Sequence, residues 1–428
     1  MHASFSVVPV SRVIVIGGGA AGFFGAITCA EHGIKDVLIL EKGPEVLDKV
    51  RISGGGRCNV MHACFDPSAL IESYPRGRKS LLGPFHRWQA SDTLDWFQSH
   101  GVNLKTEEDG RMFPVTDDSR TIIDCLTTAA NSAGVRWQTR CKIRGVRPGT
   151  PEGFLVETAT GQIIEAAILL IATGGIRSGA ARKPLTDLGH RFDPPVPSLF
   201  TFQIRDERLA GLQGVSVQKS SVRAGDLRSD GPVLVTHRGL SGPGILKLSA
   251  LGARELAKRE YKFELRIDWT AGKSPEAFVT MIQEERRIHG ARKVMTRSPL
   301  EQFPRRLWER LCLASGVTDA TSWSNLTRTQ ERDLTAQLRD GRFQVEGKSL
   351  NKDEFVTCGG VRLQDVNLRT MESRTVPNLY FAGEVLNIDG ITGGYNFQSA
   401  WTTGRIAGEA IAEACGALTK PGPESFHG

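Results

Sequence analysis

The chain has 428 residues, of which 40% are hydrophobic and 24% are charged. These values are ordinary for a globular protein and exclude a collagen, a coiled coil and wholesale disorder. The net charge is +7, which suits an anionic ligand, a nucleic acid or a membrane surface without choosing between them. Glycine is in excess, with 47 residues, and it gathers in clusters.

Two features of the sequence bear on the compartment. Residues Val13 to Ala30 carry no charge, but five glycines interrupt the apolar run that a membrane span or a signal peptide needs. The eight cysteines are scattered and contain no C-x-x-C pair, which is typical of a reduced protein without a zinc ribbon. We therefore expect a cytoplasmic protein with no metal site and no membrane association.

Hydrophobic periodicity predicts an α/β fold that begins with a strand–glycine–helix–strand unit. The expected strands are 12–16, 37–40, 135–146 paired with 154–158, 167–171 and 379–383. The expected helices are 20–32, 91–100, 119–133 and 396–415, and residues 42–66 are expected to form a glycine-rich loop. Beyond the proline-rich boundary at 193–197, residues 198–270 alternate like antiparallel strands with one helix at 242–258, and residues 274–340 are helical in pattern.

The later return to the style of the first segment indicates a discontinuous domain that encloses an insertion. We predict the first domain over 1–195 and 357–428, an inserted β-rich domain over 196–272 and 341–356, and a small helical insert over 273–340. Length alone is consistent with two or three domains.

Three glycine-rich segments carry the chemistry. Gly17, Gly19 and Gly22, with Ala20 and Ala21 between them, form a G-x-G-x-x-G fingerprint between a strand and a helix. The glycines permit the turn, the approach of a pyrophosphate and close helix packing, and the helix N-terminus favours phosphate. Glu41 ends the next strand and is placed to accept hydrogen bonds from an unphosphorylated ribose, which favours FAD or NAD over NADP.

The second segment runs from Ser53 through Gly54 and Arg57 to Cys58 and Asn59. Its glycines can expose N–H groups to an anion, and Arg57 with Lys49 adds positive charge. The third segment joins Gly383 and Glu384 to a glycine loop and a helix start, which can stabilise negative charge on a reduced flavin. The strand that ends in Ala172, Thr173 and Gly174 is best interpreted as a crossover of the same domain.

These strings together resemble the aminoacetone-oxidase and bile-acid-reductase-like family of FAD flavoproteins. The resemblance rests on Leu40–Lys42, Ser53–Asn59, Gly110–Pro114, Thr236–Pro243 and Gly393–Gln398. It implies a Rossmann-type FAD domain with an inserted β-barrel-like domain and a helical insert. Two departures are Cys358, where the family more often has alanine, and Asn387–Asp389, which replaces a more acidic stretch.

The resemblance also implies the cofactor-binding residues, with Ile143 beside the adenine through its backbone. Together with the motif positions, the predicted set is Gly17, Gly19, Ala20, Ala21, Gly22, Glu41, Lys42, Lys49, Ser53, Gly54, Arg57, Cys58, Asn59, Ile143, Ala172, Thr173, Gly174, Gly383, Glu384, Gly393, Gly394, Tyr395, Asn396 and Phe397.

We therefore predict an FAD-dependent oxidoreductase that transfers a hydride between flavin N5 and a small organic substrate. A second G-x-G-x-x-G is absent from the sequence, so NAD(P)H has no Rossmann module of its own, and either NAD(P)H or dioxygen can be the other redox partner. The candidate catalytic residues are Tyr395 and Asn396 beside the ring, Arg57 as a cation for reduced flavin, and His237 as a proton donor.

Three alternatives stay open. Cys58 and Cys64 could form a redox-active pair, although their C-x5-C spacing argues against it. The basic and aromatic segment Tyr74–Lys79, with His86, Arg87 and Trp88, could contact RNA, although we expect a solvated loop or an FAD-covering segment there and consider nucleic acid the less favoured partner. FAD could also have a purely structural or sensing role.

Overall fold

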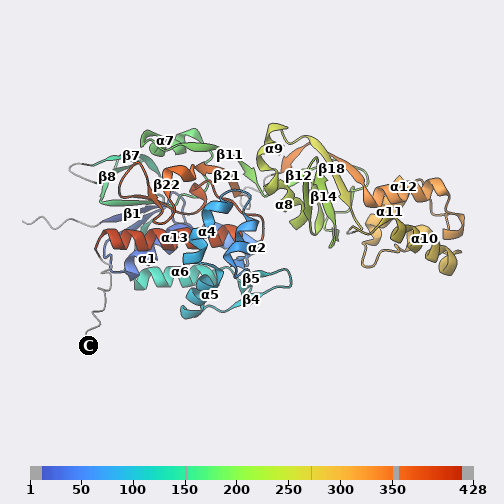
Figure 1. The fold of residues 1–428 in the computed structure, drawn as a ribbon, viewed down its shortest axis with the longest axis horizontal. Coiled ribbons are helices and arrows are strands. Elements are labelled where there is room, and N and C mark those ends of the chain that lie inside the picture. Colours follow the sequence, from blue (N-terminus) through green and yellow to red (C-terminus); the bar gives the residue numbers. More distant parts are fainter. Residues whose placement is uncertain (1–11, 150–152, 271, 350–355, 417–428) are drawn as a thin grey trace, which may run out of the picture. The chain divides into compact units, whose positions relative to one another are not determined.

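The computed structural model describes residues 12–149, 153–270, 272–349 and 356–416, and it divides into two compact units (Figure 1). Unit 1 comprises Met1–Val196 and Val356–Gly428, and unit 2 comprises Pro197–Phe355. The chain leaves and re-enters unit 1 through β11 (Phe192–Ser198) and β21 (Val356–Val361), which pair with each other.

A seven-stranded sheet forms the centre of unit 1. Its order is β22 (Val366–Asn367), β23 (Glu372–Ser373), β24 (Leu379–Phe381), β10 (Ile168–Ile171), β1 (Val13–Ile16), β2 (Val37–Leu40) and β6 (Arg136–Gln138). The last five of these strands pair in parallel. All four side chains of β1 are buried, as expected for a parallel strand that is covered on both faces.

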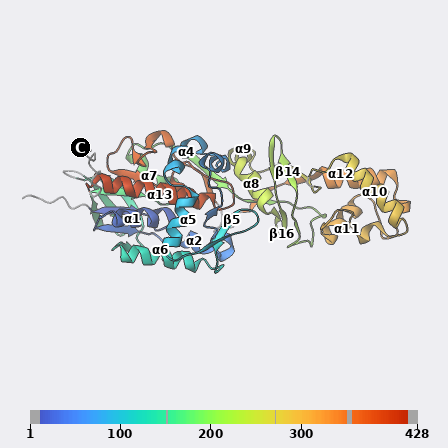
Figure 2. The same cartoon turned by 60° about the horizontal axis from the view of Figure 1, so that its bottom comes forward.

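Helices α1 (Ala20–Glu31) and α13 (Tyr395–Ala414) pack side by side along this sheet (Figures 1 and 2). Glycines make the close approach possible. A Cβ atom on Gly404 would lie 2.7 Å from the Ala21 carbonyl oxygen, and one on Gly408 would lie 2.7 Å from the Gly25 carbonyl oxygen. The N-termini of both helices follow strands of the sheet, so both glycine loops lie at the carboxyl edge of the parallel strands.

The remaining elements of unit 1 flank the sheet. The helices are α2 (Asp48–Gly56), α3 (Pro67–Leu70), α4 (Arg78–Arg87), α5 (Ala90–Ser99), α6 (Arg120–Ser132) and α7 (Gly179–Asp187), with short 3-10 turns at Ile71–Ser73, Leu363–Asp365 and Gly383–Val385. Two three-stranded antiparallel sheets contain β3 (Met61–His62), β5 (Arg111–Pro114) and β4 (Leu104–Thr106), and β7 (Ile143–Pro148), β8 (Phe154–Thr158) and β9 (Ile163–Ala166).

Unit 2 contains two antiparallel sheets and a helical part. One sheet has the order β13 (Ser216–Val217), β16 (Val233–Thr236), β17 (Gly239–Ser241), β12 (Thr201–Gln203) and β20 (Gly347–Ser349), and the other has β15 (Leu227–Asp230), β14 (Ser221–Ala224), β18 (Phe263–Asp268) and β19 (Gly341–Val345). The helices are α8 (Pro243–Leu251), α9 (Ala253–Lys258), α10 (Pro275–His289), α11 (Arg305–Ala314) and α12 (Arg328–Arg339), with 3-10 turns at Val294–Thr296 and Trp323–Asn325. The buried rings of Trp308 and Trp323 stack with centroids 6.4 Å apart in the helical core.

The sequence predictions need four local corrections. Residues 42–66 are not one loop, because they contain α2 and β3. The expected strand 135–146 is two strands: β6 joins the main sheet, and only β7 pairs with β8. The expected helix 242–258 is two helices that meet at Gly252, where a Cβ would lie 2.3 Å from the Leu227 side chain. The proline-rich boundary lies inside β11, whose place in a two-stranded sheet tolerates missing N–H donors.

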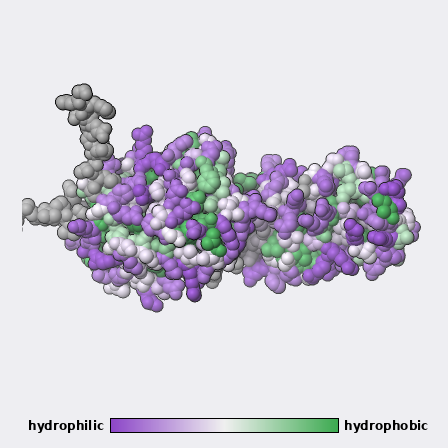
Figure 3. All heavy atoms as spheres, turned by 90° about the horizontal axis from the view of Figure 1, so that it is seen from below, coloured by the Kyte–Doolittle hydropathy of each residue, from purple (hydrophilic) through white to green (hydrophobic). Residues whose placement is uncertain are grey.

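The surface is mostly hydrophilic on the face shown in Figure 3. Among the described helices, none is long and apolar enough to cross a membrane. The division of unit 2 into a β-rich domain and a helical insert stays a prediction.

Candidate functional site: a cradle of glycine loops in unit 1

The first glycine loop joins β1 to α1 and has three different requirements for glycine. Gly17 has φ +116°, and a Cβ there would lie 2.3 Å from the Ala172 carbonyl oxygen. A Cβ on Gly22 would lie 1.9 Å from the Gly17 carbonyl oxygen. Gly19 is different, because among the described residues, its chain neighbours aside, no atom lies within 4 Å of its Cβ position. Two glycines therefore satisfy packing, while the third leaves open space at the start of α1, where a pyrophosphate fits.

Glu41 follows β2 and lies against this loop. Its two carboxylate oxygens accept hydrogen bonds from the backbone N–H groups of Gly18 and Gly43, each at 2.7 Å. These bonds fix the orientation of the carboxylate, and each oxygen keeps a further lone pair for a ribose hydroxyl. The neighbouring Lys42 is exposed. The orientation of Glu41 is compatible with a ribose contact, and the cofactor-binding roles of Glu41 and Lys42 both stay predictions.

The second segment is a helix that breaks at its glycines. Within α2, Ser53 is extended, while Gly54 and Gly55 have φ angles of +59° and +70°. Apart from their neighbours in the chain, no atom of the described part of the protein lies within 4 Å of the Cβ positions of Gly55 and Gly56. The backbone is therefore exposed on one side of this turn, as an anion-binding nest requires.

Arg57 is held by its own neighbours. Its guanidinium lies 2.7 Å from Glu107 and 3.4 Å from Asp117, and it stacks on the Phe113 ring at 4.0 Å from the centroid. The hydrogen bond to Glu107 is the main reason that the pKa of Arg57 is raised. Glu107 and Asp117 therefore balance the positive charge of Arg57. Stabilisation of a reduced flavin by Arg57 stays a prediction.

The third segment is bound to the second by direct contacts. In the orientation that satisfies both neighbours, the Asn59 amide donates to the Met61 carbonyl at 3.1 Å and accepts from the Gly394 N–H at 3.0 Å. The Trp401 indole donates to the Val60 carbonyl at 3.0 Å. Segments about 340 residues apart in the sequence, as those of Val60 and Trp401 are, therefore form one continuous cradle.

Asn396 and Tyr395 position the C-terminal glycine loop. The Asn396 amide donates to the Gly390 carbonyl at 3.0 Å and accepts from the Gly390 N–H at 2.9 Å. The Tyr395 carbonyl accepts from the Tyr74 hydroxyl at 2.6 Å. Burial raises the pKa of the Tyr395 phenol, so it is protonated at neutral pH and can donate a proton but cannot act as a base.

Lys49 and Glu384 join the second and third segments through an ion pair of 2.6 Å. Glu384 also accepts from the Thr357 N–H at 2.8 Å. Burial would raise the pKa of this carboxyl, but the Lys49 ammonium and the Thr357 hydrogen bonds outweigh burial and hold the pKa below its ordinary value.

We expect the contribution of Glu384 to the stability of the folded protein to decrease in acid. Because its folded pKa is depressed, the contribution is fully present above the unfolded value of about 4.5 and is lost as pH falls through the lower folded value. Thermal unfolding from pH 7 to pH 3.5 should show a steeper loss of Tm for the native protein than for Glu384→Gln. Parallel curves for the two proteins would contradict this assignment.

His62, which lies on β3, is a residue of this site that the sequence did not indicate. Its ring stacks on Tyr395, with centroids 4.7 Å apart, and its Nδ1 lies 3.1 Å from the Gly393 carbonyl oxygen. Because a carbonyl only accepts, Nδ1 carries the proton and Nε2 is the basic nitrogen of the neutral ring. Its position three residues after Asn59 was the one signal in the sequence that pointed to the site. A lone histidine in a short strand was not enough to predict a functional role.

The other predicted residues lie in several places. Near the first loop, the Ala172 N–H donates to the Ile16 carbonyl at 2.9 Å, and Thr173 and Gly174 follow it. Ile143 begins β7, beside a register shift. The Phe397 ring stacks on Trp401 with centroids 5.7 Å apart. His237 lies in unit 2, on an exposed turn between β16 and β17, so its catalytic role stays a prediction.

The cysteines are all free thiols. Cys58 is fully buried, and burial raises its pKa to about 12, so it carries almost no thiolate at neutral pH. We expect a thiol titration of the native protein to give the same count with and without NADPH. Two thiols gained on reduction, and lost again in Cys58→Ser, would instead establish a redox-active pair.

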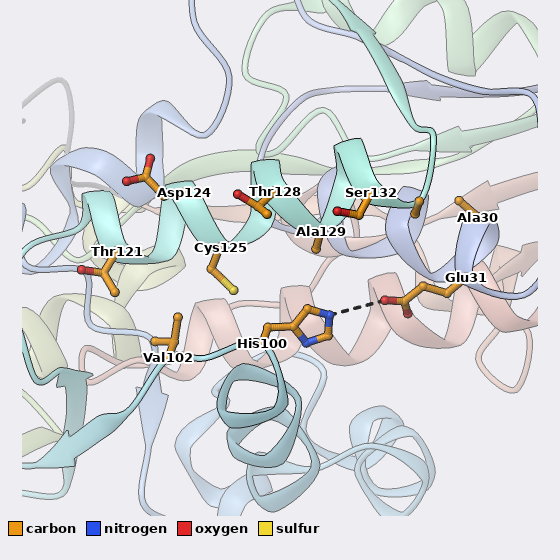
Figure 4. A pocket seen from close by; sticks show the side chains of 11 residues that line it. Ala30, Glu31, His100, Val102, Thr121, Asp124, Cys125, Thr128, Ala129 and Ser132 are labelled. Carbon is orange, nitrogen blue, oxygen red and sulfur yellow. Dashed lines mark ion pairs between the residues drawn. The ribbon is translucent and has the colours of Figure 1, made fainter.

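A further pocket lies elsewhere in unit 1. It encloses about 540 Å³ along α6 and is lined by Glu31, His100 and Cys125, among others (Figure 4). None of its lining residues belongs to the predicted cofactor set. The cradle of glycine loops is therefore a separate site.

The whole arrangement of strand, glycine loop and helix matches a known family model over residues 11–410, described as the HI0933-like protein Rossmann domain. The chain belongs to this family. The predicted resemblance to FAD flavoproteins is confirmed, the cofactor is FAD, and the protein is an FAD-dependent oxidoreductase of α/β fold.

Two relatives and one solved structure show the range of this similarity. A ribosomal RNA dihydrouridine synthase of Escherichia coli is 30% identical, with 91% of this chain and 95% of the relative aligned. A 3-dehydro-bile acid delta(4,6)-reductase of Clostridium scindens is 28% identical over 94% of this chain and 99% of the relative. The structure of a 3-ketosteroid-delta4-(5alpha)-dehydrogenase from Rhodococcus jostii has a TM-score of 0.50 and 15% identity, covering 96% of this chain and 99% of that one, and it supports the fold alone.

Proposed function

We propose that this flavoprotein reduces a carbon–carbon double bond that is conjugated with a carbonyl group, using NADH or NADPH as the electron source. The observation that carries the proposal is the chemistry shared by the two relatives, which align over more than nine tenths of the chain. A dihydrouridine synthase adds two hydrogens to a pyrimidine ring, and a delta(4,6)-reductase of a 3-dehydro-bile acid saturates a ring system beside a ketone.

The cradle supplies what such a reaction needs from the protein. Bound FAD would contribute hydride transfer at N5. Open backbone at Gly19 and Gly55 suits the pyrophosphate, and Glu41 suits a ribose. The N-terminus of α13 directs its positive dipole end toward the Gly393–Gly394 loop, where it stabilises negative charge. The Tyr395 phenol, which is protonated at neutral pH, is the proton donor that we propose beside this loop.

The test is anaerobic reduction of the purified FAD-loaded protein, followed by flavin absorbance. We expect NADH or NADPH to bleach the flavin and a conjugated 3-oxo-steroid acid or a uridine-containing RNA to restore it. Recovery with dioxygen alone would contradict the proposal and indicate an oxidase. Flavin that dithionite reduces, but neither nucleotide reduces and no substrate reoxidises, would indicate a structural or sensing role.

The RNA substrate is the second candidate, and one specific observation favours it. Two relatives carry the name ribosomal RNA dihydrouridine synthase, at 30% and 27% identity over 91% and 92% of this chain. Mass spectrometry of nucleosides from ribosomal RNA, incubated with enzyme and NADPH, would detect dihydrouridine directly. Turnover of the steroid acid without dihydrouridine would assign a small-molecule substrate instead.

A further inference from the structure

The net charge of the chain lies entirely in one unit. Residues 197–355 contain 27 Lys and Arg against 20 Asp and Glu, which gives +7, whereas the remaining residues contain 27 of each. Unit 1, which holds the cofactor cradle, is therefore neutral, and unit 2 carries the whole positive field. A field of one sign over one unit attracts an extended anion rather than a compact neutral substrate.

Part of this excess lies in the helical part of unit 2, where residues 273–340 contain 12 Lys and Arg against 9 Asp and Glu. Between Arg286 and Arg297 there are five basic residues and no acidic one. We define the basic surface as five exposed cations of this part. They are Arg292, Lys293, Arg297, Arg306 and Arg310. Among the described residues, none of the five forms an ion pair, so carboxylates of the protein do not neutralise their charge.

Backbone carbonyls orient part of this surface. The Arg306 guanidinium donates to the Gly211 carbonyl, Arg310 donates to the Ala210 carbonyl at 3.2 Å, and Lys293 donates to the Ala320 carbonyl at 2.7 Å. A carbonyl fixes a guanidinium without cancelling its charge, and the remaining N–H groups stay available in a fork that matches a phosphate.

A pocket gives this surface depth. It encloses about 420 Å³ between α11 and the 3-10 turn at Val294–Thr296, and Arg306 and Arg310 line it. Arg297 follows Thr296, another lining residue, directly in the chain. The lining also includes two carboxylates. Arg305 neutralises Glu309 through an ion pair of 2.8 Å, and Asp319 offsets one of the two charges of Arg306 and Arg310. The pocket is therefore positive on balance and wide enough for a sugar–phosphate unit.

The basic segment that the sequence singled out in unit 1 is different. Its Arg76 pairs with Asp389, Arg78 pairs with Glu72, and Arg87 lies 3.0 Å from Glu409. Tyr74 is fully buried. These side chains hold the C-terminal glycine loop and the surface of unit 1, and their charges are largely balanced, so this segment has little charge left for RNA.

We propose that the basic surface of unit 2 binds the phosphate backbone of RNA. This inference rests on the second candidate function, the uridine form, in which the enzyme reduces a uridine base within RNA. Cations without carboxylate partners give affinity by releasing counterions from the nucleic acid, without reading its sequence. The partner is therefore recognised by its phosphates, and the choice of base falls to the flavin site.

The test uses the full-length FAD-loaded protein and a fluorescent 30-nucleotide uridine-containing RNA hairpin. We expect binding in the range of about 1–100 µM near physiological salt, as is usual for backbone contacts, with strong salt dependence. Arg292→Gln/Arg297→Gln removes two charges that make no side-chain hydrogen bond in the described structure. It should weaken binding about 10-fold and lower the salt slope by about 1.5 to 2.

A matched variant removes two exposed cations from unit 1, Lys35→Gln/Arg120→Gln, and should bind RNA as the native protein does. Equal affinity for all three proteins, or equal loss in both variants, would overturn the proposal. Polyglutamate binding as tight as RNA would overturn the assignment to RNA in favour of an acidic protein.

The two proposals fail separately in these experiments. RNA binding without formation of dihydrouridine would leave the basic surface in place and contradict the uridine form of the function. Reduction of the steroid acid without RNA binding would contradict the basic surface and leave the proposed reduction of a small molecule in place. Flavin absorbance of each variant shows whether the cofactor site is intact.

Discussion

Replacing Asp389 by alanine is expected to lower the free energy of unfolding by about 3–5 kcal/mol, because a buried guanidinium would lose its partner. Asp389 is fully buried, and the Arg76 side chain is only 14% exposed. The two groups form a bidentate pair in which the Arg76 Nε lies 2.6 Å from a carboxylate oxygen. Urea denaturation of the native and variant proteins, followed by circular dichroism, measures the difference.

Cofactor affinity should fall with stability in this variant. Asp389 immediately precedes Gly390, whose backbone pairs with Asn396 at the start of α13. Release of Asp389 therefore frees the loop that leads to Gly393 and Gly394. Equilibrium dialysis of FAD should show weaker binding at a temperature where both proteins are folded.

Two further variants separate the buried charge from simple loss of contact. Asp187→Ala breaks a surface pair in which Lys183 and Asp187 are 70% and 53% exposed, and it should cost no more than about 1 kcal/mol. Arg76→Met/Asp389→Leu removes both charges and should regain part of the stability, because an apolar pair leaves no buried ion uncompensated. A loss for Asp389→Ala as small as that for Asp187→Ala would contradict the role of the pair.

The parts of the fold that the sequence predicted well are local. The succession of β1, Gly17, α1 and β2 is encoded within about thirty residues, and each glycine meets a steric need of its own neighbours. The same holds for the start of α13 after β24. The place of Glu41 beside the glycine loop was also predictable, since it directly follows β2.

Contacts between distant segments were not predictable. Arg76 and Asp389 are 313 positions apart, and nothing near either residue indicates the other. For this reason the sequence predicted a solvated or FAD-covering segment at Tyr74 and Arg76. In the structure both side chains contact the C-terminal glycine loop and position it. The partners of Arg57 were hidden for the same reason, since Glu107 lies between β4 and β5 and Asp117 lies beyond β5.

Ion pairing is another property that the net charge does not reveal. A value of +7 is compatible with several kinds of partner, and the basic and aromatic residues of Tyr74–Lys79 indicated a possible RNA contact in unit 1. The structure shows which arginines have carboxylate partners. Arg78 has one and Arg306 has none among the described residues, a distinction that depends on packing.

The first glycine loop carries the second prediction of large effect. Gly22→Ala places a Cβ 1.9 Å from the Gly17 carbonyl oxygen. Because this oxygen belongs to the backbone, the clash can be relieved only if the loop moves. We expect purified Gly22→Ala to contain less than about a tenth of the native FAD and to unfold at lower temperature, as overpacking commonly costs about 1–3 kcal/mol. Absorbance of the flavin per protein measures the first effect, and thermal unfolding measures the second.

Gly19→Ala distinguishes packing from cofactor binding within the same loop. Within the part of the chain that the structure describes, only its chain neighbours come within 4 Å of its Cβ position, so the folded protein without cofactor should keep its stability. The methyl group would occupy the space proposed for the pyrophosphate, and FAD affinity should fall at least about 10-fold, the equivalent of 1.4 kcal/mol. Gly83→Ala, in α4, also meets open space but lies away from the loop, and it should keep both stability and FAD. Native FAD affinity in Gly19→Ala would place the pyrophosphate elsewhere and contradict the cradle, whereas loss in Gly19→Ala alone would locate the phosphate at the start of α1.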